Sequence, residues 1–173
     1  MMRKAYLAGP DVFLPNAALL AAAKIALCAS YGITGIHPFN PNLDFTRPAA
    51  QLWRQIYADD LGMMRECDII IANLTPFRGA SADAGTLVEL GWFLGAGKPA
   101  FGYSNSAQNF ATRSRAQIAA APDPLPGLEV EDFGLADNLM IEGALVGSLT
   151  LPPDNITRPF DCLEIFELCL KQL

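Results

Sequence analysis

One glutamate stands alone in an apolar stretch and is the first candidate for chemistry. Residues 84–97 read AGTLVELGWFLGAG, and Glu89 is their only charged side chain. The large apolar residues of this stretch point in nearly every direction around a helix axis: Leu87, Val88, Leu90, Trp92, Phe93 and Leu94. Such a helix is covered by the protein core on one side and by something else on the other. A carboxylate there is costly unless it is paired or functional, so the pattern favours a functional Glu89 over an ordinary solvated glutamate.

Asp83 and Gly85 precede Glu89 at the start of the same predicted helix. The ordinary role of Asp83 is that of an N-cap, whose carboxylate accepts hydrogen bonds from backbone N–H groups two or three residues further on. Because Asp83 also follows a predicted strand, it could instead hold the hydroxyl groups of a sugar. Gly85 has no side chain and leaves room for a ligand to approach the backbone. The three residues together indicate a binding site, although none of them is specific alone.

Two further groups could act together with Glu89. Asp59 and Asp60 are adjacent in a predicted helix, where successive side chains point about 100° apart, so at most one of them needs to face inward. A solvated pair is the alternative, but two carboxyl groups in different environments can divide the roles of nucleophile and acid. Tyr6 lies in a predicted buried strand, where it is either a core residue or directs its hydroxyl toward a carboxylate.

The sequence argues against a metal site and against nucleic-acid binding. It contains one histidine, His37, and four cysteines without C-x-x-C spacing, which excludes the common zinc patterns. The net charge is −6 and the twelve Lys and Arg residues are scattered, whereas a polyanion requires clustered positive charge. No Gly-Lys-Ser/Thr sequence follows Gly79, so there is no P-loop. A neutral or cationic small substrate is therefore expected.

Composition limits the class of protein further. Apolar residues make up 51% of the 173 residues and charged residues only 17%, which excludes a disordered chain. So few charges also suggest that part of the surface is hidden in a subunit interface. Lys24 interrupts the alanine-rich stretch near the start, and Gly, Pro and Asn interrupt the longest uncharged run, 25–43, so neither a signal peptide nor a membrane span is expected. Scattered cysteines at apolar positions are typical of a reducing compartment, so we expect a cytoplasmic protein.

Alternating strands and helices must position the candidate residues. Short apolar runs predict strands at 5–8, 33–36, 68–74 and 99–103, with a fifth possible at 128–133. Helices are predicted at 15–30, 48–66, 84–96 and 159–173, whereas 104–137 has the composition of a loop. This order predicts a single α/β domain over 1–173, with a doubly wound (flavodoxin-like) parallel five-stranded sheet and helices on both faces. Ligands of such folds bind beyond the carboxyl ends of the strands.

Four segments of the chain together match one family pattern. They are YLAGPDVF at 6–13, DDLGMMRECDIIIANLTPFRG at 59–79, DAGTLVELGW at 83–92 and DNLM at 137–140. In these segments the chain resembles the nucleoside 2-deoxyribosyltransferase family, and the D-x-G-x-x-x-E pattern is the most specific part of the match. The resemblance implies a transferase that moves 2-deoxyribose from one nucleobase to another without a cofactor. The configuration is retained through a covalent deoxyribosyl-glutamate.

The resemblance also implies a role for each catalytic candidate. Glu89 would be the nucleophile, and Tyr6 would orient and tune its carboxylate. Asp83 would hold the sugar hydroxyls, while Asp60 would contact the base and assist its protonation as it leaves. The partners would be a deoxyribonucleoside and a free nucleobase, with no nucleic-acid polymer, membrane or metal involved.

A second group of residues is implied to bind substrate. Asn138 and Met140 match residues that the family supplies from a neighbouring subunit, with Asn138 at the 5′-hydroxyl, so self-association is expected. The remaining substrate-binding candidates are Gly9, Phe13, Asn40, Asn42 and Gly85.

Two alternative functions stay open from the sequence. A related 2-deoxynucleoside 5′-monophosphate N-glycoside hydrolase passes the sugar to water, and it needs cations or hydroxyl and amide donors around a phosphate. The predicted loops offer mainly Arg78 and the segment 137–140, which favours an unphosphorylated nucleoside. A non-catalytic nucleotide-binding module on the same scaffold is the other alternative, and it would not depend on Glu89.

Overall fold

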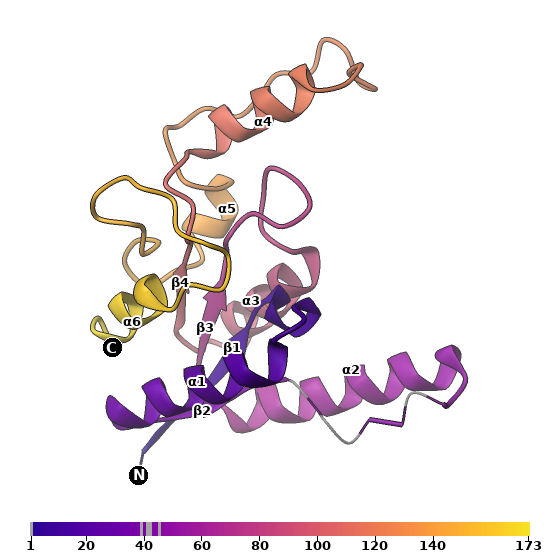
Figure 1. The fold of residues 1–173 in the computed structure, drawn as a ribbon, viewed down its shortest axis with the longest axis vertical. Helices are drawn as coiled ribbons and strands as arrows, with labels where there is room; N and C mark the ends of the chain where they lie inside the picture. The colour runs from indigo at the N-terminus through magenta and orange to yellow at the C-terminus, as the bar shows by residue number, and fades with distance from the viewer. Residues whose placement is uncertain (1, 39, 41–42, 45) are drawn as a thin grey trace.

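A parallel sheet forms the centre of the molecule (Figure 1). The computed structural model describes residues 2–38, 40, 43–44 and 46–173. Within these residues the sheet has four strands, β1 (Arg3–Ala8), β2 (Ile33–Ile36), β3 (Ile69–Asn73) and β4 (Ala100–Tyr103), in the order β2-β1-β3-β4. All neighbours are parallel, and Tyr6 in β1 lies opposite Ile36 in β2 and Ile70 in β3. The predicted doubly wound parallel arrangement is therefore confirmed.

The prediction of a fifth strand at 128–133 is wrong. These residues form no strand, because their charged residues leave no continuous apolar face and both Leu128 and Phe133 are exposed. The edge beside β4 is instead met by residues 146–150. There the N–H of Thr150 donates to the carbonyl of Gly102 at 3.0 Å, and the N–H of Ser104 donates to the carbonyl of Thr150 at 2.9 Å.

Helices cover both faces of the sheet. They are η1 (Pro10–Phe13, a 3-10 turn), α1 (Ala17–Ser30), α2 (Ala49–Glu66), α3 (Ala84–Gly95), α4 (Phe110–Ala119), α5 (Leu139–Glu142) and α6 (Glu164–Leu170). Helix α4 corrects the prediction of a loop over 104–137; its N-cap, Asn109, accepts a hydrogen bond from the N–H of Thr112 at 2.8 Å. The predicted C-terminal helix begins only at Glu164, later than expected.

The two faces of the sheet bury different residues, because successive strand side chains point to opposite sides. Ala5 and Leu7 of β1 lie in a core with α1 and α6, whereas Tyr6 and Ala8 lie in a core with α2 and α3. Helices α2 and α4 extend away from the sheet at different ends of the molecule (Figure 1). Among the described residues, no helix is long and apolar enough to span a membrane.

Candidate active site

A cavity of about 390 Å³ opens at the carboxyl end of β1, between the turn η1 and helices α2 and α3. Strands β1 and β3 are neighbours in the sheet while their connections run to opposite faces, which is where ligands bind in doubly wound folds. The lining residues are Gly9, Val12, Phe13, Pro38, Asn40, Leu43, Ile56, Asp60, Asp83, Gly85, Thr86 and Glu89. Three carboxyl groups, one from α2 and two from α3 and its N-cap, thus share one cavity.

Glu89 is held by a hydroxyl that comes from the sheet. Thr86, Glu89, Leu90 and Phe93 are spaced along one side of α3, and all but Glu89 are fully buried. The ring of Phe93 stacks on that of Tyr6 with centroids 6.0 Å apart. Glu89 lies one turn before Phe93 on the helix, and its Oε1 accepts a hydrogen bond of 2.7 Å from the Tyr6 hydroxyl. The register of α3 against β1 therefore creates a tyrosine–carboxylate pair.

Burial and neighbouring charges set the protonation of Glu89. Burial raises the pKa of Glu89 from 4.5 to about 7, and the charges of Asp60 and Asp83 add to this rise. The hydrogen bond from Tyr6 acts in the opposite direction, because it favours the ionised carboxylate. The pKa of Tyr6 itself is raised far above its usual value by burial and by Glu89, so the hydroxyl remains a donor.

Asp60 comes from α2, where it is spaced with Ile56 and Met64 along one side of the helix. Burial raises its pKa from 3.8 to about 6, and the charge of Asp59 contributes to the rise. The adjacent Asp59 does not line the cavity; its Oδ1 accepts a hydrogen bond of 2.7 Å from Gln55 Nε2. Of the two neighbouring aspartates, only Asp60 faces Glu89.

Asp83 has the geometry of an N-cap and lines the cavity as well. Its Oδ2 accepts hydrogen bonds from the N–H of Thr86 at 3.0 Å and from Thr86 Oγ1 at 3.1 Å. Both bonds use the same oxygen of the carboxylate. The two roles that the sequence offered for Asp83 are therefore compatible in space, because capping leaves the second oxygen without a bond to α3.

A second cavity, of about 400 Å³, lies in the groove between α2 and α3. It shares Ile56, Asp60, Gly85 and Glu89 with the first cavity. Its other lining residues are mostly large and apolar: Trp53, Tyr57, Leu61, Met64, Val88 and Trp92. The Asp60 and Glu89 carboxyl groups thus stand between two adjoining spaces, which the sequence did not reveal because the facing of α2 against α3 is a tertiary property.

The substrate-binding candidates do not all meet at this site. Gly9, Phe13, Asn40 and Gly85 line the first cavity, whereas Asn42 lies outside the described residues. Asn138 and Met140 line neither cavity of their own chain.

Asn138 is engaged elsewhere. It caps α5, and its Nδ2 donates to Glu131 Oε2 at 2.7 Å. Met140 follows on the same helix and is 71% exposed. Of these two residues expected to contact substrate, Met140 is therefore presented at the surface of a single chain, whereas Asn138 is half-buried.

The charge of the site is of one sign. Among the described residues that line the two cavities there is no Lys, Arg or His. Arg78 lies outside them, with its guanidinium over the ring of Phe77. Within the described ranges, no group of three or more His, Cys, Asp and Glu side chains is placed to hold a metal ion.

Sequence reasoning missed several residues of the site. Val12, Thr86 and Ile56 line it beside the predicted residues. Val12 lies within the YLAGPDVF segment and Thr86 within the D-x-G-x-x-x-E segment. Their closeness in the chain to the predicted residues could therefore have pointed to them. Ile56 could have been found from the helical spacing of four residues to Asp60.

The fold and the site define a class of protein: a doubly wound α/β domain with clustered carboxyl groups beyond its strands. The family model for nucleoside 2-deoxyribosyltransferases matches residues 5–140, and the chain belongs to this family. The match contains all the carboxyl groups described above.

Known proteins agree with this assignment. A 2-deoxyribosyltransferase from Leishmania mexicana is 29% identical, with 98% of this chain and 97% of that chain covered and a TM-score of 0.65. A 2-deoxyribosyltransferase from Bacillus psychrosaccharolyticus shares the fold at 21% identity, with 82% of each chain covered and a TM-score of 0.53. An uncharacterized protein of Schizosaccharomyces pombe is 29% identical over 97% of this chain and 87% of its own length.

Proposed function

We propose that the protein transfers 2-deoxyribose between nucleobases by a retaining double displacement. The Glu89 carboxylate attacks C1′ of a deoxyribonucleoside, and the bond between C1′ and the base breaks as Asp60 gives a proton to the departing base. The product is a covalent deoxyribosyl-glutamate. A second base then attacks C1′ from the face that the first base left, Asp60 takes back a proton, and the bond to Glu89 breaks. Two inversions restore the original configuration.

The hydrogen bond of 2.7 Å between Tyr6 and Glu89 carries this proposal. It orients one carboxylate oxygen and favours its ionised form, which is what a nucleophile requires. No side chain in the described part of the chain donates such a bond to Asp60, and its pKa of about 6 leaves a protonated fraction near neutral pH. Between pH 6 and 7 the two carboxyl groups together hold about one proton, and the proposed reaction uses the form in which Asp60 carries it, which is the less populated form because Glu89 has the higher pKa. The oxocarbenium-like transition state is cationic, and the three carboxyl groups stabilise it.

The test is base exchange with deoxyinosine and adenine. Wild type should form deoxyadenosine, and Glu89→Gln should reduce the rate by several orders of magnitude, because covalent catalysis is removed. The exposed Glu66 serves as the matched control, since Glu66→Gln should leave the rate unchanged. Mass spectrometry of a digest after a brief incubation with deoxyinosine should place a deoxyribosyl group on Glu89. Binding of the nucleoside without any exchange or release of base would favour the non-catalytic module.

The absence of cations from the described lining supports an unphosphorylated substrate, since a phosphate would meet three carboxyl groups and no counter-charge. The hydrolase alternative makes a different prediction. Deoxyribose 5′-phosphate released from a deoxynucleoside monophosphate, at the same rate with and without adenine, would support hydrolysis and contradict transfer.

A neighbouring subunit completes the site in this proposal. Two observations support it: Asn138 and Met140 line neither cavity of their own chain while Met140 is exposed, and α3 exposes Val88 and Leu94. Mixing an inactive Glu89→Gln chain with an inactive Asn138→Ala chain should then restore exchange, because mixed assemblies contain one intact site. A monomer with full activity would contradict the shared site.

A further inference from the structure

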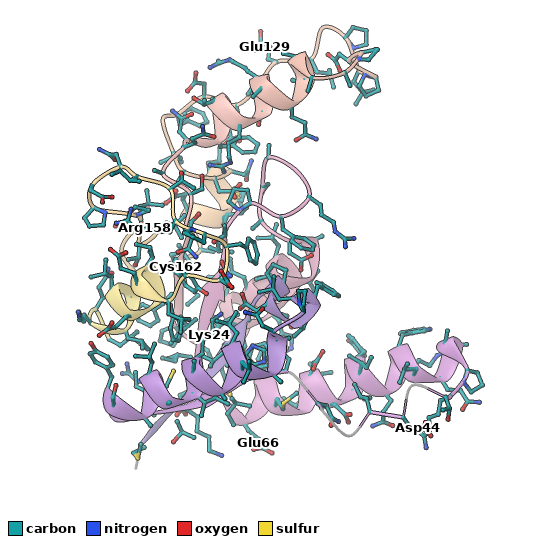
Figure 2. All side chains as sticks on the ribbon, in the orientation of Figure 1. Lys24, Asp44, Glu66, Glu129, Arg158 and Cys162 are labelled. Carbon is teal, nitrogen blue, oxygen red and sulfur yellow. The ribbon has the colours of Figure 1, made fainter. Side chains whose placement is uncertain are left out.

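A fully buried ion pair lies below the turn that forms one wall of the cavity. Lys24 is 2% exposed and belongs to the buried side of α1, whose other members are Ala17, Leu20, Ala21 and Cys28. Its ammonium contacts the carboxylate of Asp11, which is 1% exposed and lies in η1. The rings of Tyr103 and Phe166 enclose the ammonium, with centroids 5.4 and 5.3 Å away. Figure 2 labels Lys24 on α1.

The pair belongs to a chain of hydrogen bonds that reaches β3. Asp11 Oδ2 accepts from Lys24, and Asp11 Oδ1 accepts from Asn73 Nδ2 at 2.8 Å. Asn73 Oδ1 in turn accepts from the N–H of Thr75 at 3.1 Å. Both carboxylate oxygens of Asp11 are therefore fixed from outside the turn, one by α1 and the other by the end of β3.

The turn that Asp11 anchors is part of the site. Gly9, Val12 and Phe13 line the cavity on either side of Asp11. A Cβ on Gly9 would stand 2.7 Å from Cβ of Asn73, so the turn is packed directly against the residue that anchors it. The ring of Phe13 is stacked on that of Phe77, with centroids 5.7 Å apart and an angle of 18° between the planes. The turn thus presents an aliphatic and an aromatic surface whose direction depends on how the turn is held.

Stability alone does not account for this pair. Burial lowers the pKa of Lys24, which means that the buried ammonium is costly, and Asp11 only partly offsets that cost. Apolar residues of similar volume often replace a buried ion pair without loss of stability, whereas the directional bonds of the pair fix a geometry.

We propose that Lys24 and Asp11 are positioning residues that hold the turn 9–13 in the orientation in which Val12 and Phe13 contact the nucleoside. This inference rests on the proposed function, and it assigns the pair to substrate affinity. The pair does not touch the reacting atoms, so the step at Glu89 should be largely independent of it.

The experiment compares Lys24→Met with the double variant Asp11→Ala/Lys24→Met in base exchange. Lys24→Met leaves a buried carboxylate without its counter-charge, so both Tm and substrate affinity should fall. The double variant removes the charge as well and should recover most of the Tm. Its KM for deoxyinosine should nevertheless stay about tenfold above wild type, with kcat within about threefold, which is the pattern of lost ground-state binding.

Leu170→Ala provides the matched control, because Leu170 is buried in the same core and lies outside both cavities. It should lower Tm and leave KM unchanged. A double variant whose KM returns to the wild-type value together with its Tm would overturn the positioning role. If wild type exchanges no bases, the proposed function fails instead, and calorimetric Kd values for deoxyinosine in the same variants still test the positioning role separately.

Discussion

The two faces of the sheet bury ionisable groups in opposite electrical settings. On the face covered by α1 and α6, Lys24 and Asp11 neutralise each other inside a closed core. On the face covered by α2 and α3, Glu89 shares an open cavity with Asp60 and Asp83, and among the described residues a tyrosine hydroxyl is its only hydrogen-bond partner. The first arrangement satisfies its charges and fixes a geometry. The second places like charges together; burial, with a contribution from neighbouring carboxylates, raises the pKa values of Glu89 and Asp60 and keeps them available for reaction.

This difference shows why burial alone does not identify a catalytic group. Lys24 is more deeply buried than Glu89, yet both oxygens of its partner Asp11 are occupied and neither residue lines either of the two cavities described above. Glu89 combines partial burial, like-charged neighbours and an opening. The combination is what separates a carboxylate that can react from a charge that supports the fold.

Among the changes to the neighbours of Glu89, removing Asp60 gives the largest effect. The proposed reaction needs Asp60 protonated and Glu89 ionised, and their pKa values are about 6 and about 7. Wild-type exchange should therefore pass through a maximum near pH 6 to 7. Asp60→Asn should reduce the rate about 10²-fold and remove the alkaline decline, leaving a single limb set by the ionisation of Glu89, whose pKa falls because the charge of Asp60 no longer raises it. Asp59→Asn is the matched control and should keep both limbs; an alkaline decline that survives in Asp60→Asn would contradict the assigned acid.

A smaller effect is expected when the tyrosine hydroxyl is removed. Tyr6→Phe deletes a hydrogen bond to a charged group, so the exchange rate should fall about tenfold. The acidic limb of the pH profile should move to higher pH, because the Tyr6 hydroxyl lowers the pKa of Glu89. Tyr31→Phe removes an equivalent bond, from Tyr31 to Glu167 Oε1 at 2.7 Å, outside the site and should change neither quantity. An unshifted limb in Tyr6→Phe would show that the hydroxyl does not tune Glu89.

The last effect concerns stability instead of rate, and it contrasts the two faces directly. The folded state raises the pKa of Glu89 from 4.5 to about 7, so its contribution to stability is complete below pH 4.5 and is lost as pH rises through 7. The side chain that Glu89→Gln introduces does not titrate. The free energy of unfolding of this variant should therefore rise relative to that of wild type between pH 4.5 and 8, by at most about 3 kcal/mol at full burial. Asp11→Asn should instead be less stable than wild type at pH 7, because it weakens a buried pair. Denaturant unfolding at several pH values measures both; a Glu89→Gln variant that gains nothing on raising the pH would contradict the raised pKa.

The local part of the site was accessible to sequence reasoning. Asp83, Gly85 and Glu89 lie within two turns of one helix, so their spacing predicted their common placement. The predictions of a fifth strand and of a loop over 104–137 were wrong, because they depended on contacts between segments that lie far apart in the chain. Strand formation at an edge depends on which segment reaches β4, and residues 146–150 reach it. The segment 128–133 has no buried face to offer.

The sequence by itself determined the order of strands and helices, the isolation of Glu89 in an apolar helix and the family pattern, because each follows from residues close together in the chain. Only the tertiary structure decided that Tyr6 reaches Glu89, that Asp60 and not Asp59 faces it, and that a second cavity adjoins the first. It also changed the meaning of Lys24, which in the sequence is merely a break in an alanine-rich stretch. Its partner Asp11 lies thirteen residues away in the chain and belongs to a different element. Such pairings depend on how helices pack on a sheet, which no local spacing encodes.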